Sequence, residues 1–215
     1  MLLQFDTYYH IFNHANGDDN LFREEKNYPF FLNKYHEHIE PIAHTIAWCL
    51  MPNHFHLLIK IRKEEEILDF FSSSDEEYKN SSKVANFRRV LLEGEEEEKS
   101  KQLSRQFSNF FSSYTQAFNK VYQRRGSLFL KTFKRKEVED DSYFYNLIFY
   151  IHLNPVKHGF VQNHRNWDWS SFHNFPKEQG EIVKRLFSSE KAFFSSHDNK
   201  TSSFDQYDKL EDDLT

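Results

Sequence analysis

The sequence predicts an α+β fold, in which strands and helices alternate around one hydrophobic core. Short segments rich in β-branched and aromatic residues alternate with longer segments whose apolar residues recur every three or four positions. Aromatic residues make up 18% of the 215 residues, which is ample material for one core. A single cysteine, Cys49, excludes an internal disulfide and a thiolate metal site. The longest apolar run is far shorter than the roughly 20 residues of a membrane span, so we expect a cytoplasmic protein with no membrane partner.

The first half of the chain predicts a strand, a helix and a hairpin. Residues 7–13 are rich in aromatic and β-favouring residues and precede an Asn-Gly turn, which is typical of a strand. A helix capped by Asn27 should follow and end near Pro41. The apolar runs 44–50 and 54–61 are separated by Met-Pro-Asn, which favours an antiparallel hairpin.

The second half predicts a long helix, a strand and a final helix. Apolar residues recur at helical spacing over 103–122, and Gly126 should end that helix. Residues 129–138 alternate loosely, as in a strand, and the next helix should begin at a capping region at 140–142 and end before Pro155. The resulting order, strand, helix, strand, strand, helix, strand, helix, is that of a ferredoxin-like antiparallel sheet with helices packed on it.

Two segments lie outside this pattern. Residues 62–100 are rich in Glu and Ser, and we expect an acidic insertion that is mobile or loosely helical and outside the core. Residues 176–215 are rich in Ser and Asp and should form a partly disordered C-terminal extension. We therefore place one domain at residues 1–175.

Charge is unevenly distributed along the chain. The net charge is −5, but residues 101–136 carry nine Lys or Arg and no Asp or Glu, whereas residues 61–100 carry 12 acidic and 7 basic side chains. A basic stretch interleaved with aromatic residues can follow a phosphate backbone while bases stack on the rings. A solvated helix face followed by a basic loop is the alternative interpretation. The predicted DNA-binding residues are Arg105, Lys120, Arg124, Arg125, Lys131, Lys134, Arg135 and Lys136.

Two histidines in the second strand of the predicted hairpin could share a cation. Because strand side chains alternate, His54 and His56 point to one face of the sheet. With 12 His in the chain, such a pair can also serve packing alone. Tyr150 and Asn154 are four residues apart on the last predicted helix, so a phenol and an amide oxygen project from one face. The four side chains predict a divalent metal site of two imidazoles and one amide beside a phenol.

Such a site suits phosphoryl transfer. A metal with open positions can neutralise charge on the leaving group of a phosphodiester. A phenol of pKa about 10 is a weak nucleophile at pH 7, but it becomes effective when it is held in line with a polarised phosphate. Attack by Tyr150 would leave a tyrosine–phosphate ester that allows rejoining without ATP. Tyr114 is a rival nucleophile, but its place in an apolar helix stripe favours a core or base-stacking role.

The other histidines are expected to be structural. His152 lies two residues from Tyr150 and should therefore face away from it. His158 and Lys157 follow the predicted helix, where a role in the turn is favoured and phosphate contact is the alternative. Surface or packing roles are expected for His10, His14, His36 and His38.

The motifs resemble those of the single-tyrosine HUH transposases, particularly the REP-associated tyrosine transposase branch. The similarity lies in MPNHFHLL at 51–58 and YIHLNPVKHG at 150–159, in this order. RRGSLF at 124–129 and WDWSS at 167–171 are also similar to the family. The acidic insertion and the C-terminal extension depart from the pattern without removing a residue of these motifs.

The resemblance implies an HUH endonuclease fold and a metal-dependent strand transferase that nicks and rejoins single-stranded or hairpin DNA. It implies that His54, His56 and, less directly, Asn154 bind Mg²⁺ or Mn²⁺, and that Tyr150 forms a 5′-phosphotyrosine intermediate. A domesticated hairpin-DNA binder without catalysis is the alternative, and a structural or metal-sensing module is a third. Monomer and homodimer both remain compatible with the resemblance.

Overall fold

The computed structural model describes residues 2–73 and 82–200, which form two compact units. The helical unit comprises Met1–Thr7, Glu24–His44 and Lys60–Phe129. The sheet unit comprises Tyr8–Arg23, Thr45–Ile59 and the chain from Leu130 onward.

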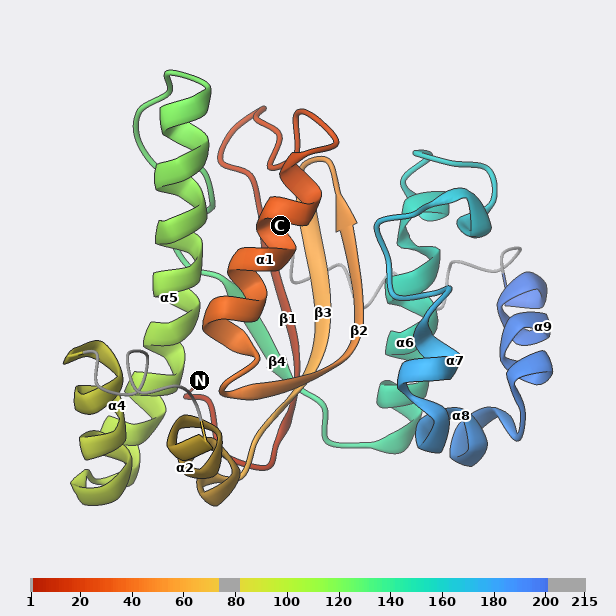
Figure 1. Ribbon diagram of the computed structural model, residues 1–215. Coiled ribbons are helices and arrows are strands. Elements are labelled where there is room, and N and C mark those ends of the chain that lie inside the picture. The colour runs from red at the N-terminus through yellow and green to blue at the C-terminus, as the bar shows by residue number, and fades with distance from the viewer. Residues whose placement is uncertain (1, 74–81, 201–215) are drawn as a thin grey trace. The chain divides into compact units, whose positions relative to one another are not determined.

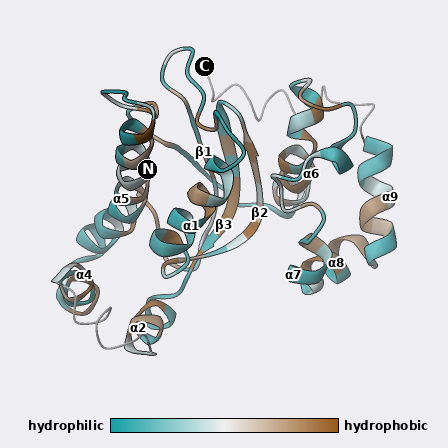
Figure 2. Cartoon of the chain, turned by 45° about the horizontal axis from the view of Figure 1, so that its top comes forward, coloured by the Kyte–Doolittle hydropathy of each residue, from teal (hydrophilic) through white to brown (hydrophobic). Residues whose placement is uncertain are grey.

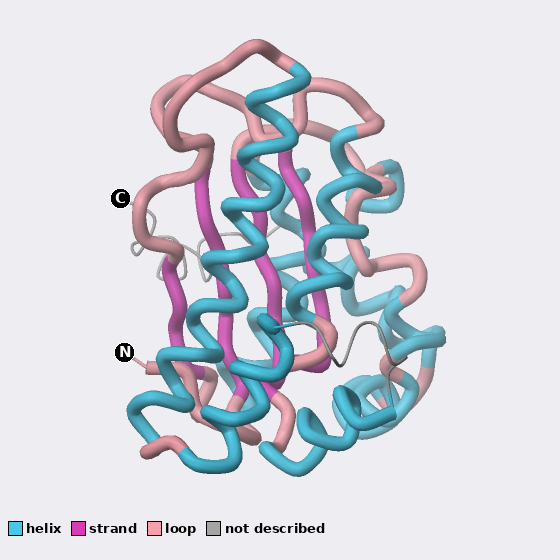
Figure 3. Tube along the Cα trace, turned by 60° about the vertical axis from the view of Figure 1, so that its left-hand side comes forward, coloured by secondary structure: helices cyan, strands magenta, loops and turns pink. Residues whose placement is uncertain are grey.

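A four-stranded antiparallel sheet forms the centre of the sheet unit. Its strands are β1 (Tyr8–His14), β2 (Ala43–Met51), β3 (His54–Ile61) and β4 (Lys134–Glu137), in the spatial order β2-β3-β1-β4 (Figure 1). Figure 3 shows the four strands side by side. This is the ferredoxin-like strand order, with one helix between β1 and β2 and helices between β3 and β4, so the predicted fold class is confirmed.

The fourth strand is shorter than the predicted 129–138. Antiparallel pairing with β1 begins with Lys134 opposite Phe12 and ends with Glu137 opposite Tyr9. Before it, the chain contacts the end of β1 outside the ladder: Leu130 N donates to His14 O at 3.0 Å, and Leu130 O accepts from Asn13 Nδ2 at 3.4 Å. The loosely alternating pattern predicted the strand but not the point where the ladder starts.

Helix α6 (Asp141–Lys157) packs on the sheet within the same unit. The Asp140 side chain accepts a hydrogen bond from Tyr143 N at 2.7 Å, as the predicted cap requires. The sequence predicted that this helix ends before Pro155, but the helix continues to Lys157. It can do so because the hydrogen-bonded turn closes beyond the proline, where His158 N donates to Asn154 O at 3.0 Å.

The core of the sheet unit joins β2, β3 and α6 to the C-terminal helices. These helices are α7 (Phe175–Glu178), α8 (Gly180–Phe187) and α9 (Glu190–Lys200), and a short 3-10 helix (His164–Asn166) precedes them. The apolar character of β2 and β3 is visible as brown in Figure 2. The largest buried side chains of this core include Phe149, Tyr150, Phe172 and Phe175. The C-terminal extension is therefore helical up to Lys200, and its last 15 residues lie outside the described part of the chain.

The helical unit contains α1 (Asn27–Ile39), α2 (Glu64–Ser73), α4 (Ser82–Glu93) and α5 (Glu96–Val121). Helices α1 and α5 pack through aromatic side chains. The ring centroids of Phe31 and Phe110 are 4.8 Å apart, and those of Phe31 and Tyr114 are 5.1 Å apart. The apolar spacing of α5 is thus used to pack against α1.

Residues 62–100 differ from the predicted mobile segment. They form α2, α4 and the start of α5, apart from 74–81, which lie outside the described residues. The prediction that this segment lies outside the core is wrong for its apolar side chains, because α2 and α4 bury a face of their own. The rings of Phe71 and Phe87 pack 5.5 Å apart. The buried residues are Ile67, Phe71, Val84, Phe87 and Leu91.

The prediction that Asn27 caps α1 is wrong. Its Oδ1 atom instead accepts hydrogen bonds from Glu24 N at 3.0 Å and from the Tyr122 hydroxyl at 3.0 Å. The side chain therefore ties the start of α1 to the end of α5. Among the described residues, no helix is long and apolar enough to cross a membrane.

Candidate metal and nucleophile site

Four predicted site residues meet inside the sheet unit. His54 and His56 come from one face of β3, and Tyr150 and Asn154 come from one face of α6. His56 Nε2 lies 3.3 Å from Tyr150 Oη, and His54 Nε2 lies 3.2 Å from Asn154 Oδ1. The strand period of two and the helix spacing of four therefore bring these side chains together, while their chemical roles remain predictions.

The site is buried, and burial keeps its imidazoles neutral. His54 is 3% exposed, Tyr150 is 1% exposed, and His56 and Asn154 are fully buried. Burial lowers the pKa of His54 to about 3 and holds the pKa of His56 well below its usual range. Both rings consequently offer lone pairs at pH 7, as metal-ligating histidines must.

His54 faces two acceptor oxygens but has only one ring proton to donate. His54 Nδ1 lies 2.8 Å from Asn53 Oδ1, and Nε2 faces Asn154 Oδ1. Because a neutral imidazole carries one ring proton, one of these contacts brings a nitrogen lone pair against an oxygen lone pair. Asn154 Nδ2 is buried without a hydrogen-bond partner in the described chain. If the amide were turned over, Nδ2 would donate to His54 Nε2, and Oδ1 would become the buried atom without a partner.

This donor set fits a divalent cation. Two neutral imidazole nitrogens and one amide oxygen converge, and a cation between them would remove the lone-pair opposition at His54. Within the described ranges, no three or more His, Cys, Asp or Glu side chains are arranged to hold a metal ion. A metal at this site would therefore depend on Asn154 as its third protein ligand.

The sequence interpretation missed His10. This residue lies on β1, next to β3 in the sheet, and its Nε2 is 3.0 Å from His56 Nδ1. It is 1% exposed, and burial lowers its pKa to about 3. The signal that could have found it is its place on a strand that the predicted fold puts beside the His-x-His strand.

Three further side chains surround the site. The His14 ring stacks on His54 at 5.5 Å, and His158 meets His54 edge-on at 4.9 Å. Lys157 Nζ lies 5.8 Å from the centre of the Tyr150 ring. Lys157 and His158 are thus next to the site, where either predicted role, turn or phosphate contact, is available to them.

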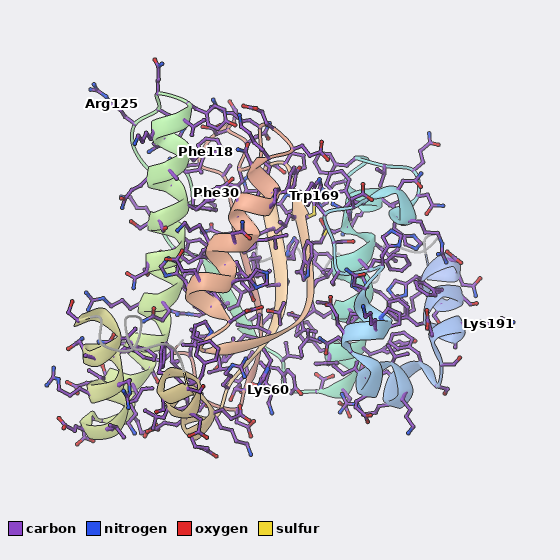
Figure 4. All side chains as sticks on the ribbon, viewed as in Figure 1. Phe30, Lys60, Phe118, Arg125, Trp169 and Lys191 are labelled. Atoms are coloured by element: carbon purple, nitrogen blue, oxygen red, sulfur yellow. The ribbon has the colours of Figure 1, made fainter. Side chains whose placement is uncertain are left out.

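The predicted DNA-binding residues are divided between the two units. That they form one continuous basic surface therefore stays a prediction. Arg124 is held in the loop after α5, where it donates to Asn119 Oδ1 and to Ser127 O, both at 2.9 Å. Arg125 is exposed and points away from the chain in Figure 4. Arg105, Lys120, Arg124 and Arg125 belong to the helical unit, and Lys131, Lys134, Arg135 and Lys136 belong to the sheet unit.

The rival nucleophile and the neighbouring histidine are placed elsewhere. Tyr114 is fully buried in the helical unit, and burial raises the pKa of its phenol, which makes it a poor nucleophile. His152 does face away from the site, as predicted, and contacts His197 and Ser171 instead. Tyr150 is therefore the phenol that lies beside the His-x-His pair.

The comparison with known proteins agrees with the motifs. The chain is 27% identical over 137 residues to a Haemophilus influenzae protein named for the REP-associated tyrosine transposases. The chain resembles this branch of transposases. The match covers 63% of the chain and 62% of that relative, which is less than two thirds of the relative's length. The resemblance predicted from the motifs is therefore confirmed.

Two other comparisons add little. No protein-family model matches the chain. A solved structure of a REP-associated tyrosine transposase bound to a REP hairpin aligns with 87% of this chain and 85% of its own, at 15% identity and a TM-score of 0.48. A likeness this weak carries no weight beside the strand order described above.

Proposed function

We propose that this protein is a transposase-like DNA strand transferase, which nicks and rejoins single-stranded hairpin DNA. The observation that carries the proposal is the position of Tyr150 Oη, 3.3 Å from a ring nitrogen of the neutral His-x-His pair. A phenol beside a cation-binding donor set is the arrangement that nucleophilic attack on a phosphodiester requires. The similarity to a REP-associated tyrosine transposase supports the same chemistry.

His54, His56 and Asn154 would hold Mg²⁺ or Mn²⁺ through two ring nitrogens and an amide oxygen. The bound ion would draw charge from the phosphate oxygens and leave positions open for them. Imidazole ligands favour Mn²⁺ over Mg²⁺, because Mg²⁺ prefers a shell of oxygens. Neutral imidazoles also bind the ion without first losing a proton.

Tyr150 would perform the covalent step. Its Oη forms a bond to phosphorus while the bond from phosphorus to the 3′ oxygen breaks. The phenolic proton is balanced by the proton that the departing 3′ hydroxyl takes up. The DNA is left as a 5′-phosphotyrosine ester, and attack by a 3′ hydroxyl reverses the step without ATP. Because Tyr150 is 1% exposed, the side chains that cover Oη must move aside before a phosphodiester reaches it.

The burial of Tyr150 also favours a second candidate, a hairpin-DNA binder without catalysis. In that protein the basic side chains of residues 101–136 would hold the DNA phosphates, and the His-x-His pair would serve the fold. Removal of divalent metal would then leave DNA binding unchanged, and no covalent product would form.

The test is covalent capture of DNA. Labelled single-stranded hairpin oligonucleotides, taken from the sequence flanking the gene, are incubated with the protein and Mn²⁺ or EDTA and separated on a denaturing gel. We expect a metal-dependent covalent band that Tyr150→Phe abolishes while DNA binding persists. Tyr145→Phe is the matched control, because Tyr145 lies on the same helix and packs against Phe149, with ring centroids 4.9 Å apart. A covalent band that survives in Tyr150→Phe would refute the assignment, and binding without any band would support the second candidate.

A further inference from the structure

We propose that His10 is a positioning residue that sets the tautomer of His56. In this arrangement His56 keeps its proton on Nδ1 and donates it to His10 Nε2, so that the lone pair of His56 Nε2 faces Tyr150. The inference rests on the proposed function, because a free Nε2 is what metal ligation and a phenol neighbour require. His10 itself need not touch metal or DNA.

The geometry between the two rings supports a single shared proton. His10 Nε2 and His56 Nδ1 are 3.0 Å apart, and the ring centroids are 5.1 Å apart with planes inclined by 30°. His10 is 1% exposed and His56 is fully buried, so water does not compete for the bond. Two ring nitrogens at this distance share a hydrogen bond, in which one nitrogen donates and the other accepts.

His54 shows the same construction with a different partner. Its Nδ1 faces Asn53 Oδ1 at 2.8 Å, and an amide oxygen can only accept. Both histidines of the pair are thus held at Nδ1, and both turn Nε2 toward α6, where Asn154 and Tyr150 lie. Metal-ligating histidines in proteins are commonly oriented in this way, by a hydrogen bond from the ring nitrogen that does not bind the metal.

The unpaired atom of His10 indicates that the residue does more than fill space. If Nε2 accepts from His56, the proton of His10 sits on Nδ1, which is buried without a hydrogen-bond partner among the described residues. An apolar ring would avoid this unpaired group, as Phe12 does two residues further along β1. In the opposite tautomer, His10 would donate to His56, whose Nε2 would then carry a proton and offer no lone pair.

The first test reads the tautomer directly, without DNA or metal. Long-range ¹H–¹⁵N correlation spectra of the ¹⁵N-labelled full chain distinguish Nδ1–H from Nε2–H imidazoles, and single-histidine variants assign the signals. We expect the Nδ1–H form for His56 and for His10. An Nε2–H signal for His56 would overturn the inference, whether or not the protein nicks DNA.

The second test measures Mn²⁺ binding and thermal unfolding of two variants. His10→Phe should bind Mn²⁺ 10- to 100-fold more weakly, the usual effect of losing such a partner, with a melting temperature equal to or above that of the wild type. His10→Gln, whose amide can occupy the place of Nε2, should recover part of the affinity. His164→Phe is the control, because it replaces a buried histidine whose ring lies against Phe172 and His197.

The outcomes separate this inference from the proposed function. Unchanged Mn²⁺ affinity in His10→Phe would overturn the inference and leave the strand-transferase proposal standing. Failure of the wild type to bind Mn²⁺ would refute the metal site itself, and with it the purpose that we assign to His10. If His10→Phe fails to fold, the tautomer spectrum of the wild type decides.

Discussion

Two clusters of buried histidines lie on different faces of α6, and they differ in how their protons are matched. The Tyr150 cluster contains Tyr150, Asn154, His54, His56 and His10, and the His152 cluster contains His152, His197, Ser171 and His164. Both are almost entirely shielded from water, and burial lowers the pKa of the histidines in both. Burial and histidine content therefore do not distinguish a functional site from a structural one.

The hydrogen bonds distinguish them. In the His152 cluster, His197 Nδ1 donates to Phe193 O at 2.9 Å, which leaves His197 Nε2 to accept from His152 Nδ1 at 3.1 Å. His152 Nε2 can then accept from the Ser171 hydroxyl at 2.9 Å. Along the chain from His197 through His152 to Ser171 every ring-nitrogen lone pair meets a proton, whereas both ring nitrogens of the neighbouring His164 are buried without a hydrogen-bond partner among the described residues.

The Tyr150 cluster has surplus lone pairs and unpaired atoms. His54 has one proton but faces two amide oxygens, and His10 Nδ1 and Asn154 Nδ2 have no partner in the described part of the chain. A cation would use the surplus lone pairs at His54, whereas the His152 chain has none to offer. The comparison teaches that the two clusters differ in one respect: His54 faces two amide oxygens with a single ring proton, and no ring of the His197–His152–Ser171 chain does so.

The largest effect should come from removing a proposed metal ligand. His54→Ala should weaken Mn²⁺ binding by more than about 100-fold, beyond the effect of losing an orienting partner, and should abolish metal-dependent nicking. Isothermal titration with Mn²⁺ and the covalent-capture gel measure the two effects. The same titration on folded His152→Ala should give the wild-type affinity, and a loss there would break the distinction between the clusters.

The next effect should appear in stability rather than in binding. His152→Ala removes a ring that packs against Phe175 at 5.2 Å and leaves Ser171 and His197 without their partner. We expect the free energy of unfolding to fall by about 2–4 kcal/mol. Urea unfolding followed by circular dichroism measures it. A smaller loss than for His54→Ala would show that the His152 cluster is not the structural one.

The smallest effect should be a change in pH dependence. Burial lowers the pKa of His164 to about 4, compared with 6.5 for an unperturbed histidine, while Asp198 opposes this shift and Arg165 and His173 reinforce it. The unfolded chain then binds a proton that the folded chain does not, so stability is complete above pH 6.5 and falls as pH drops toward 4. The loss attributable to His164 should be about 1–3 kcal/mol.

His164→Phe isolates this contribution. The variant should lose less stability than the wild type between pH 6.5 and 4, since it lacks the imidazole that the fold keeps neutral. Urea unfolding at pH 7, 6, 5 and 4.5 gives the comparison. Parallel curves for the two proteins would show that His164 does not keep its neutral form in the folded state.

The sequence predicted the order of strands and helices, because periodicity and turn residues are local signals. It also predicted which side chains of the His-x-His strand and of α6 share a face, because strands alternate and helices repeat within four residues. Where the pattern was weak, the prediction failed. In the acidic segment 62–100, the many Glu residues masked the apolar pattern of the side chains that α2 and α4 bury. At Pro155 the sequence predicted a helix end, but the helix continues to Lys157, where His158 N donates to Asn154 O.

By itself, then, the sequence determined the fold class and the two pairs of residues, His54 with His56 and Tyr150 with Asn154. Only the tertiary structure decided that these pairs meet and that His10 contacts Nδ1 of His56. The reason is physical: local periodicity fixes the direction of a side chain, but the partner of a ring nitrogen from another strand depends on which strands become neighbours. The balance of protons in a buried cluster is likewise set by contacts between residues far apart in the sequence, such as His54 and Asn154, which are 100 positions apart.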